Sequence, residues 1–409
     1  MIPSSNRRSS IPVLFSATLT LLLAAGSHAA TLRVPTDFST IQAAIDAAAD
    51  GDTVSVLPGT YAEQIDFKGK AITVTSRDGP SNTIIDGMGT VTVVIFFSGE
   101  TETSVLSGLT IQNGRADVGA GVFIGGSSPR IVGNVFRNNS DIDNGWGLAI
   151  GGAGEGTPVI DGNLFHSHTC NPNSNLSAVI TLVNGQEPRI INNVFRNNQC
   201  RGVDLTMVET TLAEVSNNTF VSNRTGIYVD ARTGTATHLI RNNIVVGNDV
   251  GIDVAFLTGI GTPTPRLLNN LVSGNTVNYQ GIDDPTGTNG NLSVAPSFVN
   301  QSLNNFQLSA GSPAIDAGEE ASAPTPTTDF GGNTRPVDGN ADSVARIDIG
   351  AFEYAPGTSP PPTPPPTTPP PSNDPGGGGG GGGALSPLEL FFYACCLLVT
   401  LLRRRNQMA

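Results

Sequence analysis

Residues 128–276 repeat one pattern of apolar and polar positions six times. Aligned on a single asparagine, the copies read SPRIVGNVFRNN, TPVIDGNLFHSH, EPRIINNVFRNN, LAEVSNNTFVSN, THLIRNNIVVGN and TPRLLNNLVSGN. The aligned residues, called here the first asparagine column, are Asn134, Asn163, Asn193, Asn218, Asn243 and Asn270. No single copy has enough apolar surface to form a core of its own. A period of 25 to 30 residues therefore predicts stacked coils that share one core.

Apolar positions flank this column at fixed distances. An Ile, Val or Leu stands three residues before each asparagine. Two residues after it come Phe136, Phe165, Phe195, Phe220, Val245 and Val272. A second asparagine column stands five residues after the first, with the members Asn139, His168, Asn198, Asn223, Asn248 and Asn275. Short runs rich in β-branched residues predict strands, and the lack of helical periodicity argues against an α-helical solenoid.

The asparagine columns are expected at the bends between these strands. Asparagine tolerates the left-handed conformation that a one-residue corner requires, and stacked amides can hydrogen-bond from coil to coil. An earlier copy, TSVLSGLTIQNG, is interpreted with Gly108 at the first asparagine column and with Val105 and Asn113 in register. The pattern as a whole predicts an all-β fold, a right-handed parallel β-helix.

The segment before the repeats predicts a short capping helix. In TLRVPTDFSTIQAAIDAAADGDTVSVLPGTY, Ser39 and Gln42 are expected to form a capping box, and Ile41, Ile45 and Ala48 one apolar helix face. Such a helix would close the open end of the stack and protect its edge. This segment and the repeats resemble the pectin-lyase-like superfamily. The resemblance implies a β-helix over residues 31–290, with any active site on the outer face of one parallel sheet.

Strand alternation then selects the candidate site residues. The strands of that sheet are expected to begin at Gly121, Gly147, Gly202, Gly226 and Gly251. Alternation points Val203, Leu205, Met207, Ile227, Val229, Ala231, Ile252, Val254 and Phe256 inward. It leaves Asp204, Tyr228 and Asp253 in one outward column, with Asp230 one step along the middle strand. Two carboxylates about 10 Å apart could flank a sugar and a water in an inverting glycosidase, or hold Ca²⁺; they could also be ordinary solvated acids.

The sequence motifs of the superfamily's enzymes are mostly absent. Asp283 and Asp284 form the only Asp-Asp pair, within a turn-rich stretch, and GAGVFIGG lacks the aspartate of the pectin methylesterases. No Lys or Arg is expected to project from the predicted strands, although a pectate lyase needs a basic residue for proton abstraction. Arg201 and Arg224 precede those strands and are interpreted as salt-bridge partners of small energetic value.

Residues 291–355 depart from the coil pattern. Their segments SPAIDAG and IDIGAFEY resemble the choice-of-anchor Q domain, which implies a terminal cap linked to anchoring rather than a catalytic unit. Asp338, Asn340 and Asp342 have the alternate spacing that begins a Ca²⁺ loop, and with Asp348 they form a candidate calcium site. Ile349 occupies the twelfth position, so the loop is not an EF-hand. An Asp/Gly turn is the alternative.

Both ends of the chain predict export. Residues 1–30 carry Arg7, Arg8 and an apolar stretch, and are expected to be a removable secretory signal. Residues 356–383 form a Pro/Gly-rich linker, and residues 384–409 are an apolar run followed by Arg403, Arg404 and Arg405. Together they resemble a GlyGly-CTERM sorting tail. The resemblance implies transient contact with the inner membrane, a sorting protease, and delivery to the cell surface or release. A single-pass membrane anchor is the alternative.

Cysteine spacing and net charge narrow the choice of partners. Cys170 and Cys200 each follow the first asparagine column by seven residues, which predicts a disulfide between neighbouring coils. His166 and His168 are interpreted as corner residues rather than as metal ligands with Cys170. The chain has a net charge of −13. That charge excludes a nucleic-acid surface, and it disfavours polyanionic glycans unless Ca²⁺ bridges them.

These observations favour a non-catalytic surface protein that binds a polysaccharide or cell-surface glycan, or that acts as an adhesin or spacer. The alternative is a polysaccharide hydrolase or lyase that uses Asp204, Tyr228, Asp230 and Asp253.

Overall fold

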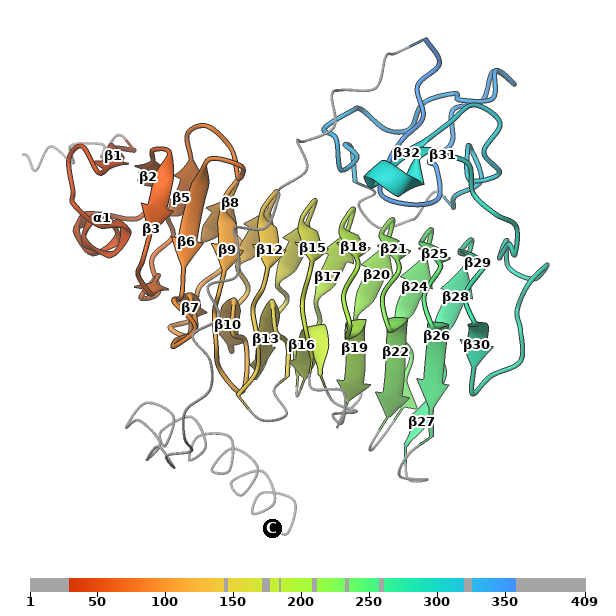
Figure 1. Cartoon of the computed structure of the whole chain (residues 1–409), viewed down its shortest axis with the longest axis horizontal. Helices are drawn as coiled ribbons and strands as arrows, with labels where there is room; N and C mark the ends of the chain where they lie inside the picture. Colours follow the sequence, from red (N-terminus) through yellow and green to blue (C-terminus); the bar gives the residue numbers. More distant parts are fainter. Residues whose placement is uncertain are drawn as a thin grey trace, which may run out of the picture. The chain divides into compact units, whose positions relative to one another are not determined.

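The repeats form three long parallel sheets in a computed structural model of the chain (Figure 1). The structure describes residues 29–142, 146–170, 177–183, 185–207, 212–231, 235–256, 261–319 and 326–357. These residues lie within one compact unit, residues 1–364. The predicted signal peptide, except for its last two residues, and the predicted C-terminal tail lie outside the described residues.

Each coil contributes one strand to each sheet. Sheet A contains β1 (Thr31–Val34), β2 (Thr53–Val56), β5 (Thr73–Ser76), β8 (Val105–Ser107), β11 (Arg130–Val132), β14 (Val159–Asp161), β17 (Arg189–Ile191), β20 (Glu214–Ser216), β24 (Leu239–Arg241) and β28 (Arg266–Leu268). Sheet B contains β3 (Gly59–Tyr61), β6 (Thr83–Asp86), β9 (Thr110–Gln112), β12 (Val135–Arg137), β15 (Leu164–His166), β18 (Val194–Arg196), β21 (Thr219–Val221), β25 (Ile244–Val246) and β29 (Leu271–Ser273). Sheet C contains β4 (Ile65–Asp66), β7 (Val94–Phe96), β10 (Val122–Gly125), β13 (Ile150–Ala153), β16 (Ala178–Val183), β19 (Arg201–Met207), β22 (Thr225–Ala231), β26 (Val250–Ala255) and β30 (Val277–Gln280).

Smaller pairs complete the described elements: β23 (Thr235–Ala236) with β27 (Thr262–Pro263), and the antiparallel β31 (Phe298–Asn300) and β32 (Asn305–Leu308) around the 3₁₀ helix η1 (Gln301–Leu303).

The apolar columns form the core of the stack, as the repeat predicts. Ile131, Ile160 and Ile190 pair in register across β11, β14 and β17, and all three are fully buried. Phe136, Phe165, Phe195 and Phe220 stack with ring centroids 4.9, 4.7 and 4.6 Å apart. These separations match the spacing of hydrogen-bonded strands, so each ring packs on the next without leaving a void. The all-β parallel β-helix is confirmed.

The first asparagine column forms a buried ladder at the bend between sheets A and B. The Oδ1 atom of Asn218 accepts from the backbone N–H of Asn193 at 2.9 Å and from its side-chain amide at 3.0 Å. The amide of Asn218 donates to the carbonyl of Ile190 at 2.8 Å and to Asn243 Oδ1 at 3.1 Å. Each coil boundary along this column thus satisfies polar groups that could not otherwise be buried.

Two details of the predicted register are wrong by one residue. The left-handed conformation belongs to the residue before each member of the first column, such as Gly133 (φ 65°) and Asn217 (φ 54°). In coils where both positions are asparagines, the first residue therefore forms the bend and the second forms the ladder. Gly108 (φ 64°) is likewise a bend residue, because Leu106, not Val105, pairs with Ile131. Gly108 consequently lies one position before the first asparagine column.

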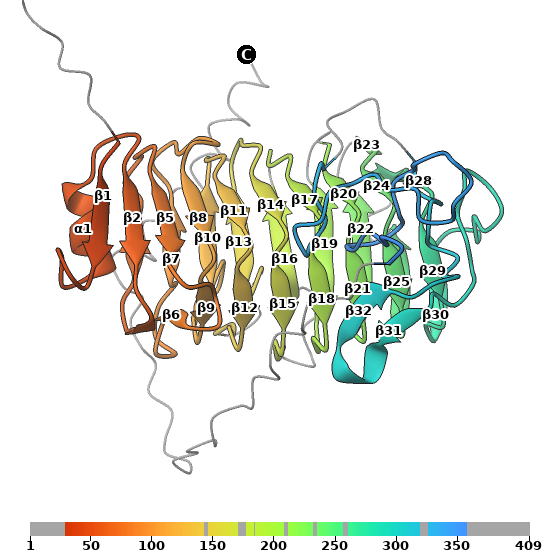
Figure 2. The ribbon, with the colours of Figure 1, turned by 90° about the horizontal axis from the view of Figure 1, so that it is seen from above.

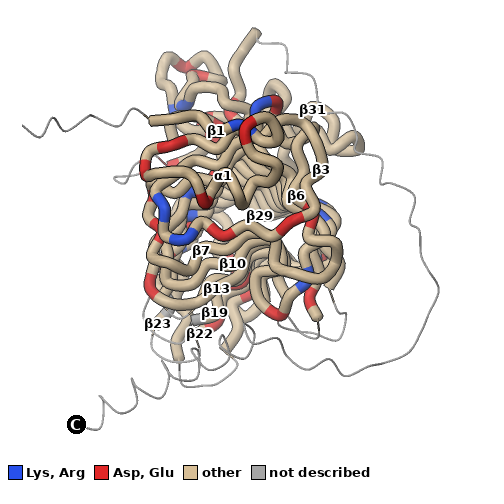
Figure 3. Tube along the Cα trace, turned by 90° about the vertical axis from the view of Figure 1, so that its left-hand side faces the viewer, with Lys and Arg blue, Asp and Glu red and all other residues tan. Residues whose placement is uncertain are grey.

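The capping helix α1 (Ile41–Ala47) is present at the N-terminal end of the stack (Figure 3). Its cap differs from the predicted capping box, because Thr40 Oγ1, not Ser39, accepts from the N–H of Ala43 at 3.1 Å. The Glu63 carboxylate accepts from the first two N–H groups of the helix, each at 3.0 Å. Lys70 Nζ donates to three carbonyls at the opposite end, at 2.7 to 2.8 Å. The two charges complement the helix dipole.

The C-terminal segment, residues 291–357, lies along the side of the coils (Figures 1 and 2). Phe306, Leu308, Ile349 and Ala351 pack on an outer face of sheet B made by Val194, Val221, Ile244 and Leu271. The segment, which the resemblance implied to be a terminal cap, covers a lateral face of the later coils. Several outward residues of sheet B in these coils are apolar, namely Val194, Val221, Ile244 and Leu271, so the uncovered face would expose hydrophobic surface.

Four bend asparagines hold the C-terminal segment in place. The side-chain amides of Asn192, Asn217, Asn242 and Asn269 donate to the carbonyls of Thr328, Asp348, Glu319 and Ala317 at 2.9 to 3.1 Å. In the two preceding coils the same bend position is Gly133 and Gly162. The change from glycine to asparagine thus marks where the segment docks. Glycine suffices elsewhere because only the left-handed backbone is needed.

Buried acids organise the C-terminal segment, which has little regular structure. Asp316 accepts from the N–H groups of Gly339 and Asn340 at 3.0 and 2.7 Å. Asp348 accepts from the N–H groups of Asp316 and Tyr354 at 2.7 and 2.6 Å. The acids of SPAIDAG and IDIGAFEY therefore provide the backbone hydrogen bonds that strands would otherwise supply.

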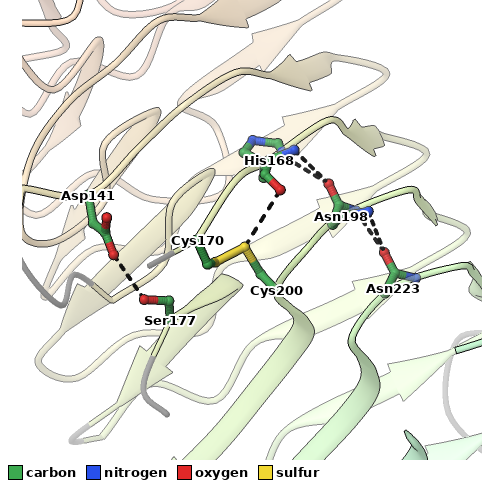
Figure 4. Close-up of a disulfide and its surroundings, with 7 residues drawn as sticks. All are labelled: Asp141, His168, Cys170, Ser177, Asn198, Cys200 and Asn223. Atoms are coloured by element: carbon green, nitrogen blue, oxygen red, sulfur yellow. Dashed lines mark hydrogen bonds between the residues drawn. A yellow bond between two sulfur atoms is a disulfide. The ribbon is translucent and has the colours of Figure 1, made fainter. Parts of the chain in front are cut away.

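The predicted disulfide joins Cys170 and Cys200, whose Cα atoms are 5.5 Å apart (Figure 4). It lies beside the second asparagine column, where His168 Nδ1 is 3.0 Å from Asn198 Oδ1. Within the described residues, no helix is long and apolar enough to span a membrane.

Candidate functional site

The outer face of sheet C brings the predicted acids together in one column. Asp204 on β19 pairs with Tyr228 on β22, and Tyr228 pairs with Asp253 on β26. Thr181 on β16 and Gln280 on β30 extend this column in both directions. Asp230 lies two residues further along β22, in register with Thr206. The predicted column is confirmed, with two neighbours that the sequence analysis did not name.

Arg201 is the unexpected member of this site. It is the first residue of β19, and its guanidinium carbon lies 3.4 Å from the centroid of the Tyr228 ring. Its Nη1 atom is 2.7 Å from Asp204 Oδ2, in an ion pair whose side chains are only 14% and 3% exposed. The expectation that no basic residue projects from this sheet is therefore wrong. The strand begins one residue earlier than expected and includes the arginine.

The site is far more buried than an open row of acids. Asp204 is 2% exposed, Tyr228 is 3% exposed and Asp230 is fully buried. Asp204 Oδ1 accepts from the hydroxyl and the N–H of Thr206, at 2.6 and 3.0 Å. Both oxygens of Asp204 are thus engaged, one by Arg201 and one by Thr206. A carboxylate held in this way cannot also activate a water molecule or receive a substrate proton without losing these bonds.

The pKa values reflect the burial. Burial raises the pKa of Tyr228 to about 12, although Arg201 opposes the shift. At neutral pH the phenol is therefore protonated. Burial also raises the pKa of Asp253, opposed by Arg201 and by a hydrogen bond from Gln280. Gln280 Nε2 donates to Asp253 Oδ1 at 3.2 Å. Asp253 is the most accessible carboxylate of the column.

Several inward assignments are confirmed, and others are not. Val203, Leu205, Ile227, Val229, Ala231, Ile252 and Val254 are buried, while the side chain of Met207 lies outside the described residues. Phe256 is 52% exposed, because β26 ends at Ala255 and the alternation ends with it. The strand expected to begin at Gly147 is β13, which begins at Ile150. β16 was not predicted, because it is an apolar strand without a leading glycine.

The four candidate calcium ligands do not form one site. Asp338 accepts from the N–H of Ser343, and Asn340 from that of Asp342, each at 2.9 Å. Asp342 pairs with Arg346 at 3.0 Å, whereas Asp348 is buried against the backbone of the segment. Across the described residues, no group of three or more His, Cys, Asp and Glu side chains could hold a metal ion. The alternative of an Asp-rich turn describes residues 338–344.

The three described histidines of the repeat region are structural. His168 lies in the second asparagine column, as interpreted from the sequence, and its burial lowers its pKa to about 4. Burial lowers the pKa of His166 to about 3. His238 accepts from the N–H of Ala213 through Nδ1 at 3.1 Å. The sequence showed no partner for His238, because that partner is the backbone of the preceding coil.

Arg201 forms a salt bridge, as interpreted from the sequence, but its place inside the site was not predicted. A signal was present, since Arg201 stands at the position that Thr225 and Val250 occupy in the next two coils. Alternation from Val203 would also place Arg201 on the inner face. A Cβ at Gly202 would lie 2.9 Å from the inward-facing Phe220 ring, so Gly202 and Val203 both face inward, the alternation is interrupted there, and Arg201 reaches the outer face.

One family match agrees with this topology. Residues 81–277 match the family model described as "Right handed beta helix region". No curated protein matches the sequence at a significant level. Among solved structures, the chain is similar to one described as pectate lyase Pel9A, with 16% identity and a TM-score of 0.38. That alignment covers 80% of this chain and 97% of the other. A likeness this low carries no argument about activity.

By its sheet topology and the family match, the chain is a right-handed parallel β-helix protein. The match ends before the C-terminal segment, so the choice-of-anchor Q and GlyGly-CTERM resemblances remain predictions.

Proposed function

We propose that this chain is a non-catalytic, exported surface protein that binds glycan. The observation that carries the proposal is the state of the column on sheet C. Arg201 pairs with Asp204 and covers the ring of Tyr228, so the acids and the phenol are bound to each other within the fold. A hydrolase needs two carboxyl groups that can reach a sugar and a water. Here only Asp253 is partly accessible.

A buried ion pair of this kind acts on the fold. Arg201 is satisfied on one side by Asp204 and on the other by the π face of Tyr228. The three residues come from two adjacent strands, so the contact fixes β19 against β22 beyond the backbone ladder. Because Asp204 has this structural role, it is not available to a substrate. A hydrolase would therefore lack its second carboxylate.

Composition favours neutral glycan over charged polymers. Without the two arginines of the predicted signal and the three arginines and one glutamate of the predicted tail, 16 basic residues face 33 acidic ones. A uronate polymer would be repelled by such a surface at moderate ionic strength. A neutral polysaccharide would not be repelled by this surface.

Export and anchoring complete the proposal. The disulfide between Cys170 and Cys200 is suited to an oxidising compartment outside the cytoplasm. The C-terminal linker and apolar run would carry the folded coils to the surface after contact with the inner membrane and a sorting protease. Fractionation of cells that express the full chain and a variant truncated after Gly383 tests this part. Surface exposure of both alike would contradict a sorting role for residues 384–409.

A polysaccharide-active enzyme remains the second candidate, favoured by one observation. The raised pKa of Asp253, beside Tyr228 and within the field of Arg201, is the kind of shift that acid–base residues show. Such an enzyme would use Asp253 as its exchanging carboxyl group and would depend on it.

Affinity electrophoresis tests the proposed function. Residues 31–357 would be run through native gels that contain, one at a time, a β-glucan, a mannan, a xylan, a pectate and an alginate. We expect retardation in at least one neutral gel and none in the two uronate gels without Ca²⁺. Equal mobility in every gel would overturn glycan binding and leave a structural role.

A further inference from the structure

A hollow of about 540 Å³ lies where the C-terminal segment meets the coils. Its coil side is formed by Asn197, Val221 and Ser222, at the end of β18 and β21. Its other side is formed by Gln301 and Ser302 of η1, by Asn304, which follows η1, and by Phe306 of β32. Figures 1 and 2 both show η1 beside these coils. The site therefore exists only when the C-terminal segment is docked.

The lining is unusual for this acidic chain because it contains no charged residue. The lining residues carry three amides and two hydroxyls, together with the apolar side chains of Val221 and Phe306, which are 2% and 3% exposed. Amides and hydroxyls both donate and accept, and they match the hydroxyls of a sugar. Apolar side chains suit the C–H face of a pyranose ring. A volume of this size lies in the range of small-molecule sites.

Three of the residues that line the hollow have a left-handed backbone conformation. Asn197 and Ser222 occupy the left-handed bend before the second asparagine column, with φ of 53° and 57°. Asn304 also has a left-handed backbone, with φ 59°, and it ends η1. The amide of Asn197 donates to Asn304 Oδ1 at 3.4 Å, which links the two sides.

We propose that this hollow is the glycan-binding site of the protein and that it takes one or two neutral sugar units. The proposal rests on the proposed function and names its location. It also explains why the C-terminal segment docks laterally: docking builds one side of the site. A uronate would find no cation among the lining residues, which agrees with the charge of the whole chain.

Filling the hollow tests the proposal. Ser302→Trp would occupy the space with an indole, and Gln301→Ala would remove one amide without adding volume. Ser81→Trp serves as the matched control, because Ser81 is an exposed turn residue far along the sequence from the site. Each variant would first be checked for an unchanged thermal midpoint. Binding of neutral hexasaccharides of glucose, mannose and xylose would then be measured by calorimetry.

We expect Ser302→Trp to weaken binding by at least about 100-fold and Gln301→Ala by about 10-fold, with Ser81→Trp unchanged. If the wild-type chain binds a hexasaccharide and Ser302→Trp binds it equally well, the location is wrong while glycan binding stands. If the wild-type chain binds none of them and is not retarded in any neutral gel, the proposed function and this site both fail.

Discussion

The guanidinium of Arg201 lies 3.4 Å above the ring of Tyr228 on the adjacent strand and pairs with Asp204 at 2.7 Å. This contact converts a row of acids that could have been a catalytic site into a packed cluster. The column predicted from strand alternation exists, but its members are committed to one another. Arg201 was expected to precede strand β19, but it belongs to that strand. Its contacts make the acidic column a packed cluster rather than an open site.

Removing the arginine should be costly. In an Arg201→Met variant, Asp204 would keep its burial but lose its cation, and we expect a loss of about 3 to 5 kcal/mol in the free energy of unfolding. Arg77→Met is the matched control, because the Arg77–Asp78 pair is 55% and 39% exposed. That control should leave the free energy of unfolding almost unchanged, because both side chains are exposed to solvent. Thermal unfolding of both variants measures the difference. Equal, small effects would show that the Arg201 pair is no stronger than a surface pair.

His168 should make stability depend on pH. Its folded pKa of about 4 lies below the ordinary value of 6.5, because it is fully buried in the second asparagine column. The neutral form is therefore favoured in the folded state. Its contribution is complete above pH 6.5 and is lost as the pH falls through 4, by about 3 kcal/mol.

A His168→Asn variant would restore the residue type of the column and should flatten part of this dependence. His166 and His238, also buried with lowered pKa values, stay in both proteins and set the remaining slope. Unfolding midpoints between pH 7 and 4 measure the effect. Identical pH profiles for variant and wild type would contradict the burial of a neutral His168.

The bend asparagines should control docking of the C-terminal segment. Asn242 exchanges two hydrogen bonds with Glu319, at 3.0 and 2.8 Å. Asn242→Gly keeps a left-handed bend possible and removes both bonds, at a cost of about 1 to 3 kcal/mol. Hydrogen exchange should then speed up in residues 291–357 and stay unchanged in the coils before Gly162.

Asn138→Gly is the control for this experiment, since Asn138 has nearly the same φ, 54° against 53°, and is exposed. Exchange in residues 291–357 should not respond to it. A response of equal size would mean that bend flexibility, rather than the lost amide, loosens the segment.

The disulfide should matter for stability. Cys170 and Cys200 are 30 residues apart in sequence, so replacing both with alanine should lower the free energy of unfolding by about 3 kcal/mol. Thermal unfolding with and without reductant provides the measurement. The double variant should be insensitive to reductant, and a wild-type protein that is equally insensitive would contradict a bonded pair.

Much of the fold could be predicted because the repeated sequence pattern defines how neighbouring coils align. The spacing of the first asparagine column and the phenylalanines two residues later fixed the strands of sheets A and B, since both columns face the same core in every coil. Sheet C was harder. Its strands follow bends of variable length, so β16 and the start of β13 could not be found by counting from an asparagine.

The site was predicted in part for the same reason. Alternation along β19, β22 and β26 is a local rule, and it placed Asp204, Tyr228 and Asp253 correctly. The reach of the Arg201 side chain is not local, and neither is the lateral docking of residues 291–357. The change from Gly162 to Asn192 at the bend was the one sequence signal for docking of the C-terminal segment. It can be interpreted only when the residues that lie opposite the bend are known.

Release of product from polysaccharides tests the central claim most directly. Wild-type residues 31–357 and an Asp253→Asn variant would be incubated with neutral and acidic polysaccharides, with and without Ca²⁺. New reducing ends and the ultraviolet absorbance of unsaturated uronates would be followed. The account predicts equal background signals from both proteins on every glycan. Product from the wild-type chain that disappears with Asp253→Asn would contradict it and establish an enzyme on the outer face of sheet C.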